Sequence, residues 1–160
     1  MSWVAVICLI IGFLLGVTVL KPLSHRAYRF GLKVRFWIRH GRKGKFILFV
    51  YSDSSNWKDY VETKVLPRIE AHSIILNWSR RREWEARMSF ETKLFNHWAG
   101  SSEFAPTAIL LPLTGKVKVI RLWQPSHAKT GKDKVSKEAE EALYSTMNQL
   151  GRHSRGSKQE

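Results

Sequence analysis

The chain has 160 residues, with 27 Lys and Arg against 13 Asp and Glu, which gives a formal net charge of +14. This balance favours an anionic partner, either nucleic acid or the anionic surface of a membrane. The single cysteine, Cys8, excludes an intrachain disulfide, and nothing in the cysteine usage indicates an oxidising compartment.

The first predicted element is an apolar run from Trp3 to Leu20 that contains no charged side chain. As a helix it would be roughly 27 Å long, close to the thickness of a bilayer core. A cleaved signal peptide fits less well, because no Lys or Arg precedes the run and no A-x-A-like site follows it. A buried core helix is a weaker alternative. Residues 1–20 are therefore predicted to be a transmembrane anchor, in which Gly12 and Gly16 would allow a homodimer.

The next segment, residues 21–44, is predicted to be a basic juxtamembrane segment. Residues 21–45 hold nine Lys and Arg and no acidic residue. This asymmetry predicts a single-pass membrane protein with its N-terminus outside and its C-terminal domain in the cytoplasm. Ala27, Phe30, Val34 and Trp37 recur at helical spacing, which is typical of a helix that lies in the interface.

Anionic membrane lipids are accordingly the expected partner of the basic segment. The side chains assigned to the membrane surface are Arg26, Arg29, Lys33, Arg35, Arg39, Arg42 and Lys43. Nucleic acid is less favoured as the partner, because no DNA- or RNA-binding motif accompanies these charges.

Residues 45–150 read as alternating strands and helices, and residues 151–160 as a disordered tail. The expected strands are 45–51, 73–78, 107–113 and 116–123; the expected helices are 55–72 with a kink at Pro67, 82–100, and 134–151 ending at Gly151. Strands joined by helices imply a parallel pair, and the last two strands are expected to form a hairpin.

This β-α-β-α-β-β-α order, together with two short stretches, resembles the thioredoxin-like fold, an α/β fold with a mixed sheet. The first stretch is "YSDSSNWKDYV", where an overlay puts Ser55 and Lys58 at the positions of the family's C-x-x-C cysteines. The second is "FAPTAILL", whose Pro106 matches a family proline with a cis bond that packs against the active turn. The resemblance covers roughly residues 45–150 and implies a cis bond between Ala105 and Pro106.

Because Ser55 and Lys58 stand at the positions of the family's two cysteines, the overlay implies that thiol chemistry is absent. The family's reaction needs a thiolate whose pKa is lowered at a helix N-terminus, and a serine hydroxyl is far less acidic. The overlay puts Phe49 where the family has a buried acid. Disulfide oxidoreductase activity is therefore not expected, and Ser54 or Ser55 is expected to be an N-cap.

What remains is a surface that would bind an extended peptide, as the family's turn does. The residues assigned to it are Ser54, Ser55, Asn56, Trp57, Ala105 and Pro106. Two interpretations of Trp57 stay open: an exposed ring that binds a peptide, or a ring that packs on Tyr60 or Val61.

The predicted function is thus a membrane-anchored, redox-inactive binding or scaffolding module at the cytoplasmic membrane face, with a protein partner. The alternatives are a membrane-bound enzyme with non-thiol chemistry, through Ser55 or the arginines at 80–82, and a membrane-tethered nucleic-acid binder. No cofactor or metal is expected, because the histidines lack ligand spacing and no P-loop is present.

Overall fold

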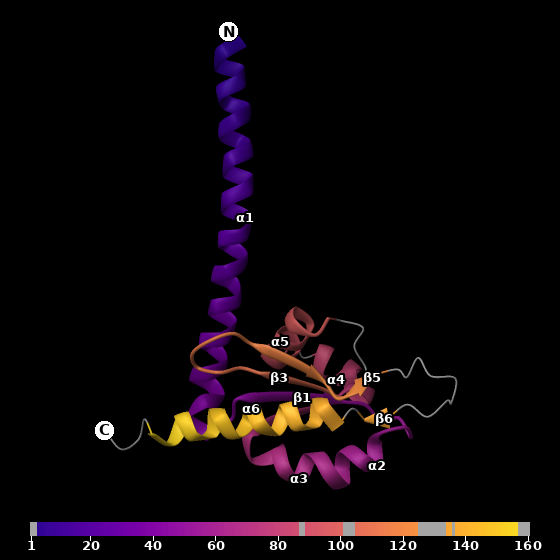
Figure 1. Cartoon of the computed structure of the whole chain (residues 1–160). Helices are drawn as coiled ribbons and strands as arrows, with labels where there is room; N and C mark the ends of the chain where they lie inside the picture. Colours follow the sequence, from indigo (N-terminus) through magenta and orange to yellow (C-terminus); the bar gives the residue numbers. More distant parts are fainter. Residues whose placement is uncertain (1–2, 87–88, 101–104, 125–133, 136, 157–160) are drawn as a thin grey trace. The chain divides into compact units, whose positions relative to one another are not determined.

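The computed structural model describes residues 3–86, 89–100, 105–124, 134–135 and 137–156 (Figure 1). The chain divides into two compact units, Met1–Phe36 and Trp37–Glu160.

Helix α1 spans Trp3–His40. Its residues as far as Phe36 belong to the first unit, and its last turn, from Trp37, belongs to the second unit. The apolar run does not form a helix of its own, because α1 continues without a break through Lys21 and the basic residues that follow (Figure 1). In the part of the chain that the structure describes, no helix is both long enough and apolar enough to cross a membrane. This finding overturns the prediction of a single-pass transmembrane anchor over residues 1–20, and with it the predicted outside N-terminus and cytoplasmic domain.

The second unit is an α/β structure built on a four-stranded mixed sheet. Its strands lie in the order β2-β1-β3-β4, with β1 (Ile47–Tyr51) parallel to β2 (Ser73–Asn77). Strand β3 (Thr107–Leu110) runs antiparallel to β1, and β4 (Lys118–Arg121) runs antiparallel to β3. The predicted parallel pair and the predicted hairpin are both confirmed.

Helices cover both faces of the sheet (Figure 1). On one face lie α2 (Lys58–Tyr60), α3 (Leu66–Ile69) and α6 (Lys137–Gly156), and on the other lie α4 (Arg81–Ala86) and α5 (Phe90–Trp98). All five residues of β1 are consequently buried, which explains why this strand reads as a continuous apolar run.

Of the helix predicted over 55–72, residues 58–72 are helical, in four consecutive pieces, and Pro67 interrupts the hydrogen bonding between them. Between α2 and α3 lies the π-helical η2 (Val61–Val65), in which the Leu66 N–H reaches back to the Val61 carbonyl. A proline carries no N–H and clashes with the carbonyl four residues earlier, so wider winding just before Pro67 is the expected response. The short η3 (Glu70–His72) then leads into β2.

Three predicted elements differ most from the structure. The single helix expected over 82–100 is divided into α4 and α5, and Ser89 caps α5 by accepting a hydrogen bond from the Thr92 N–H at 3.1 Å. The strand expected over 116–123 is divided into β4 and β5 (Trp123–Gln124), and β5 pairs with β6 (Lys134–Val135). Helix α6 begins after β6 and continues past the expected end to Gly156, so the predicted tail is helical as far as that residue.

The main core fills the sheet face beneath α2, α3 and α6. Alternate β1 side chains point into it and meet apolar residues of the helices at helical spacing. Its fully buried members include Ile47, Phe49, Val65, Ile69, Leu110 and Leu143. The last turn of α1 is tied to the same unit, since the Trp37 indole N–H donates to the Leu111 carbonyl at 2.9 Å. Two further short turns complete the unit, η1 (Gly41–Lys43) and η4 (Trp78–Arg80).

Candidate functional site

The turn between β1 and α2 lies at the carboxyl ends of the two parallel strands, where open α/β sheets bind ligands. The Ser54 carbonyl accepts the N–H groups of Trp57 and Lys58, and the Ser54 hydroxyl accepts the Asn56 N–H at 3.4 Å. Helix α2 begins only at Lys58, with Trp57 at the N-cap and no side-chain cap. The prediction that Ser54 or Ser55 caps this helix is therefore wrong, although Ser54 still orders the turn.

Trp57 is buried in the core rather than displayed on the turn. Its side chain is 3% exposed, and its indole N–H donates to the Ser52 carbonyl at 3.1 Å. The ring meets Trp123 edge to face, with 5.1 Å between the ring centroids, and belongs to the same buried cluster as Val61. Of the two interpretations that the sequence left open, packing is the one the structure shows.

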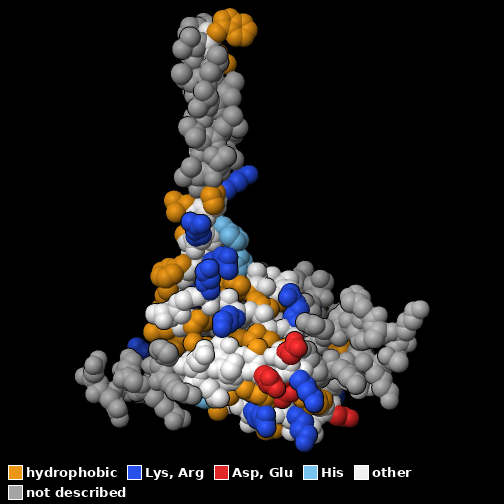
Figure 2. Space-filling model, viewed as in Figure 1, with side chains coloured by type: hydrophobic (Ala, Val, Ile, Leu, Met, Phe, Trp, Pro, Cys, Tyr) orange, Lys and Arg blue, Asp and Glu red, His pale blue; other side chains and the backbone are white. Residues whose placement is uncertain are grey.

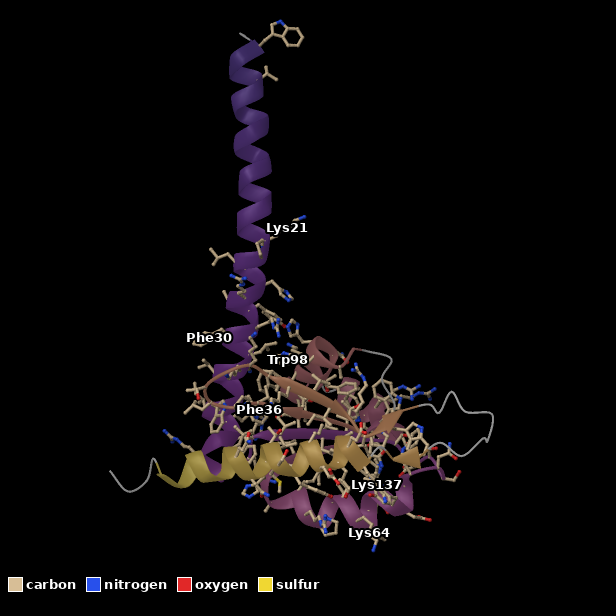
Figure 3. All side chains as sticks on the ribbon, viewed as in Figure 1. Lys21, Phe30, Phe36, Lys64, Trp98 and Lys137 are labelled. Carbon is tan, nitrogen blue, oxygen red and sulfur yellow. The ribbon has the colours of Figure 1, made fainter. Side chains whose placement is uncertain are left out.

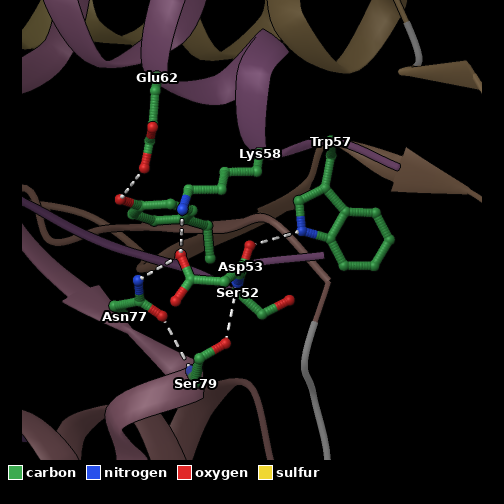
Figure 4. A network of polar contacts seen from close by, with 8 residues as sticks. Ser52, Asp53, Trp57, Lys58, Glu62, Asn77 and Ser79 are labelled. Atoms are coloured by element: carbon green, nitrogen blue, oxygen red, sulfur yellow. Dashed lines mark hydrogen bonds and ion pairs between the residues drawn. The ribbon is translucent and has the colours of Figure 1, made fainter. Parts of the chain in front are cut away.

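A polar network holds the opposite side of the turn (Figure 4). The Asp53 carboxylate accepts a hydrogen bond from the Asn77 amide at 3.0 Å and lies 3.3 Å from the Lys58 ammonium. The Asp53 N–H donates to the Ser79 hydroxyl, and the Asn77 side-chain oxygen accepts the Ser79 N–H. The Asn77 hydrogen bond, followed by the Lys58 contact, lowers the pKa of Asp53, so this carboxylate is ionised at neutral pH.

A second carboxylate meets the turn from the helix side. The Tyr51 hydroxyl donates to Glu62 at 3.1 Å, a contact drawn as a dashed line at Glu62 in Figure 4. The Tyr51 side chain is 7% exposed. Burial, followed by the hydrogen bond to Glu62, raises the pKa of Tyr51 to about 12. The phenol is therefore neutral, and it donates its proton to Glu62 rather than acting as a base.

Four members of this network were not predicted from the sequence: Asp53, Asn77, Ser79 and Glu62. A signal was available, because Asp53 and Ser79 each lie two residues beyond the end of neighbouring parallel strands. Such strand ends share one edge of the sheet, where their polar side chains come within reach of one another.

No catalytic pair is assembled at Ser55. Its side chain is exposed, and no described residue forms a hydrogen bond with its hydroxyl. Lys58, at the second family cysteine position, is paired with Asp53, and Phe49 is fully buried among apolar side chains. A nucleophilic hydroxyl needs a base within hydrogen-bond reach, so the geometry gives Ser55 no activation.

The loop that carries Ala105 and Pro106 differs from the expectation. The described residues contain no cis peptide bond, so the predicted cis bond between Ala105 and Pro106 is wrong. The resemblance to the thioredoxin-like family thereby loses its main support, the proline loop, and rests on the order of the strands and helices. The Pro106 carbonyl accepts the Leu122 N–H at 2.9 Å, which extends the pairing of β3 and β4 beyond their ends. Ala105 and Pro106 are both buried, and Ala105 shares the core cluster with Trp57. Only Ser54, Ser55 and Asn56 of the predicted peptide-binding set therefore have side chains accessible to solvent.

Three consecutive arginines extend the exposed part of this edge. All three are exposed: Arg80 is the last residue of η4, and Arg81 and Arg82 are the first two residues of α4. The Arg81 guanidinium lies over the ring of Trp78, 5.5 Å from its centroid, and Trp84 is anchored by donating its indole N–H to the Asn77 carbonyl at 2.9 Å. The arginines are therefore presented on a firmly packed base of aromatic side chains.

Apart from this turn, a concavity of about 370 Å³ opens between α3 and α6. It is lined by Tyr60, Thr63, Lys64, Pro67, Arg68 and Glu140. The Tyr60 hydroxyl donates to Glu140, and burial followed by this contact raises the pKa of Tyr60 to about 12. The Arg68 guanidinium lies 4.0 Å from Glu140 and over the Tyr144 ring, so the polar groups here already satisfy one another.

The basic residues assigned to a membrane surface fall in both units. Arg26, Arg29, Lys33 and Arg35 belong to the first unit, whereas Arg39, Arg42 and Lys43 belong to the second. Arg39 and His40 both contact Glu91 of α5, at 3.5 and 2.9 Å, so Arg39 has a structural partner. Gly12 and Gly16 lie in α1, and dimerisation through them stays a prediction.

Among the described residues, no group of His, Cys, Asp and Glu could hold a metal ion. Comparisons with protein-family models, with curated proteins and with solved structures find no match for the chain.

Proposed function

We propose that the second unit is a redox-inactive, thioredoxin-like binding module that takes an acidic segment of a partner protein. The binding surface, the arginine edge, consists of five residues: Ser55, Asn56, Arg80, Arg81 and Arg82.

The observation that carries the proposal is the chemistry of the turn. A thiol enzyme needs a reactive cysteine there, but this turn has an unactivated serine and a lysine paired with Asp53. Asp53, at the start of the turn, is held by its hydrogen bonds to Asn77 and Ser79. An unreactive turn at the edge where open α/β sheets bind ligands supports binding instead of catalysis.

The choice of an acidic partner rests on the side chains of the arginine edge. Ser55 and Asn56 offer hydroxyl and amide donors, and the exposed arginines offer planar guanidinium groups that match carboxylates. The net charge of +14 adds long-range attraction for an acidic segment. The enzyme alternative gains no such support, because Ser55 lacks a base.

The binding test uses the full chain and a fluorescently labelled peptide rich in glutamate. We expect binding at moderate salt that the double substitution R80E/R82E weakens about tenfold or more, because it replaces attraction with like-charge repulsion. The matched control is K116E/K118E, which makes the same change of charge at two exposed lysines of the β3–β4 hairpin. Equal losses in both variants, or no peptide binding by the wild type, would contradict the arginine edge as the site.

The redox test is separate, so the two halves of the proposal fail independently. We expect no thiol-dependent reduction of insulin by the wild-type chain, whereas S55C/K58C gains activity if the overlay on the thioredoxin-like family holds. Reduction of insulin by the wild type would show that the module is not redox-inactive, whatever the peptide result.

A further inference from the structure

Helix α1 carries an exposed apolar stripe beyond Lys21, outside the arginine edge. Leu23 is 59% exposed, Phe30 is 68% exposed and Val34 is 39% exposed. Ala27 is also exposed and lies between them. The spacings of four, three and four residues place all four side chains on one face of the helix.

Cations border this stripe. At about 100° per residue, Arg26 and Lys33 fall roughly 60 to 80° to one side of Leu23, and Arg35 falls roughly 120° to the other. No acidic residue occurs anywhere between residues 21 and 45. Figure 2 shows Lys and Arg side chains alternating with hydrophobic ones along this part of α1, and Figure 3 shows Lys21 and Phe30 projecting from the helix.

We infer that residues 21–36 of α1 bind the surface of an anionic lipid bilayer, with the stripe of Leu23, Ala27, Phe30 and Val34 facing the acyl chains. The helix lies on the surface, and the inference involves no membrane-spanning segment. Apolar side chains then enter the boundary between headgroups and acyl chains, while the flanking cations meet the anionic headgroups.

The combination of apolar and cationic side chains on α1 fits an anionic bilayer better than a nucleic acid or a second copy of α1. A nucleic acid would satisfy the cations, but it offers aliphatic Leu23 and Val34 no apolar phase to enter. A second copy of α1 would cover the apolar stripe, but it would bring Arg26 and Lys33 close to another set of cations. An anionic bilayer satisfies both the charge and the apolar surface.

The test measures co-sedimentation of the full chain with vesicles at about 0.15 M salt. One vesicle contains phosphatidylcholine alone, and the other contains about 30% phosphatidylserine. We expect binding to the anionic vesicle to exceed binding to the neutral one. R26E/K33E is expected to weaken anionic-vesicle binding about 30-fold, because each basic residue near such a surface adds appreciably to affinity.

A second variant examines the apolar stripe without any change of charge. L23S/F30S should also weaken binding by about tenfold or more, because two exposed apolar side chains no longer enter the bilayer. K116E/K118E again serves as the charge-matched control, and it should bind as the wild type does. Circular dichroism would verify that the helical content of each variant is unchanged.

Three results would overturn the inference. One is equal binding to neutral and anionic vesicles by the wild-type chain. Another is full retention of binding by L23S/F30S, which would leave only non-specific electrostatics. The third is tighter binding to single-stranded RNA than to anionic vesicles, with R26E/K33E reducing the RNA affinity and L23S/F30S leaving it unchanged, which would identify the segment as a nucleic-acid binder.

Discussion

The two sides of the turn that follows β1 differ in what surrounds them. On the inner side, Trp57 is 3% exposed and packs against Trp123 in the core. On the outer side, the side chains of Asp53 and Lys58 are 38% and 41% exposed and form an ion pair in contact with solvent. Both sides belong to one short segment, so substitutions on each side can compare what buried packing and a solvated ion pair contribute to stability.

The inner side of the turn contributes to stability, and the outer side borders the proposed binding surface. The buried indole removes a large apolar area from water and fixes where α2 begins. The solvated network gains little energy, since water competes for each of its hydrogen bonds, but it fixes Asp53, which lies two residues before the exposed Ser55. We therefore expect inner substitutions to act on stability and outer substitutions to act mainly on binding.

The largest expected effect follows from truncation of the inner side chain. Trp57→Ala should lower the free energy of unfolding by about 3–5 kcal/mol, because it removes buried area and leaves a cavity beside Trp123. Trp57→Phe should cost less, since it keeps most of the packing and loses the hydrogen bond to the Ser52 carbonyl. Urea denaturation of both variants measures the difference.

Ser55→Ala is the control on the exposed part of the same turn. It should change the free energy of unfolding by no more than about 0.5 kcal/mol. A Trp57→Ala variant as stable as Ser55→Ala would show that the inner side is not buried.

Tyr51 lies between the two sides, because it is buried but donates to Glu62. Its pKa is raised from 10.0 to about 12 in the folded state, so the folded chain holds this proton more tightly than the unfolded chain does. Its contribution to stability is complete below about pH 10 and is lost as the pH rises toward 12. Tyr51→Phe should therefore lose about 0.5–1.5 kcal/mol at neutral pH and show a shallower alkaline decline than the wild type.

Urea denaturation from about pH 9 to 11.5 would record this decline. Tyr60→Phe is a matched control, since the pKa of Tyr60 is also raised to about 12 but its partner is Glu140, away from the turn. Each variant should remove its own part of the pH dependence, and the double variant should remove both. Parallel curves for Tyr51→Phe and the wild type would refute the contribution of the Tyr51–Glu62 hydrogen bond.

The sequence predicted the strands of the sheet where apolar residues form continuous runs bounded by turn residues. Apolar runs and the Thr114–Gly115 turn located β1, β2 and the β3–β4 hairpin, because burial and turn geometry leave a direct trace in residue type. The two-residue strands β5 and β6 are too short to show a period. The division between α4 and α5 had a local signal, a serine three residues before Thr92, but the apolar spacing on either side obscured it.

The candidate site was harder to predict because its partners are distant in sequence. Asn77 and Ser79 reach Asp53 across 24 and 26 residues, and only the register of β1 against β2 brings them together. The burial of Trp57 likewise depends on Trp123, which the helical spacing around residue 57 does not reveal. The apolar run at 3–20 gave a misleading prediction, because composition alone did not show that α1 continues through the basic segment.

Among the substitutions that remove a side-chain interaction of the turn, the smallest expected effect on stability comes from Asp53. Asp53→Asn keeps an acceptor for Asn77 and removes the ion pair with Lys58, so its stability cost at neutral pH should be below that of Tyr51→Phe. The pKa of Asp53 is lowered in the folded state, so its contribution is present above the unfolded value near 4 and is lost as the pH falls through the folded value. Urea denaturation at acidic and neutral pH should therefore show less acid loss in Asp53→Asn than in the wild type. On the proposed function, the same variant should bind the glutamate-rich peptide more tightly, because it removes a carboxylate that interacts electrostatically with Arg80 while Lys58 keeps its charge. A variant that lost both stability and peptide affinity in proportion would show that Asp53 serves only the fold, and that the outer side of the turn has no separate role in binding.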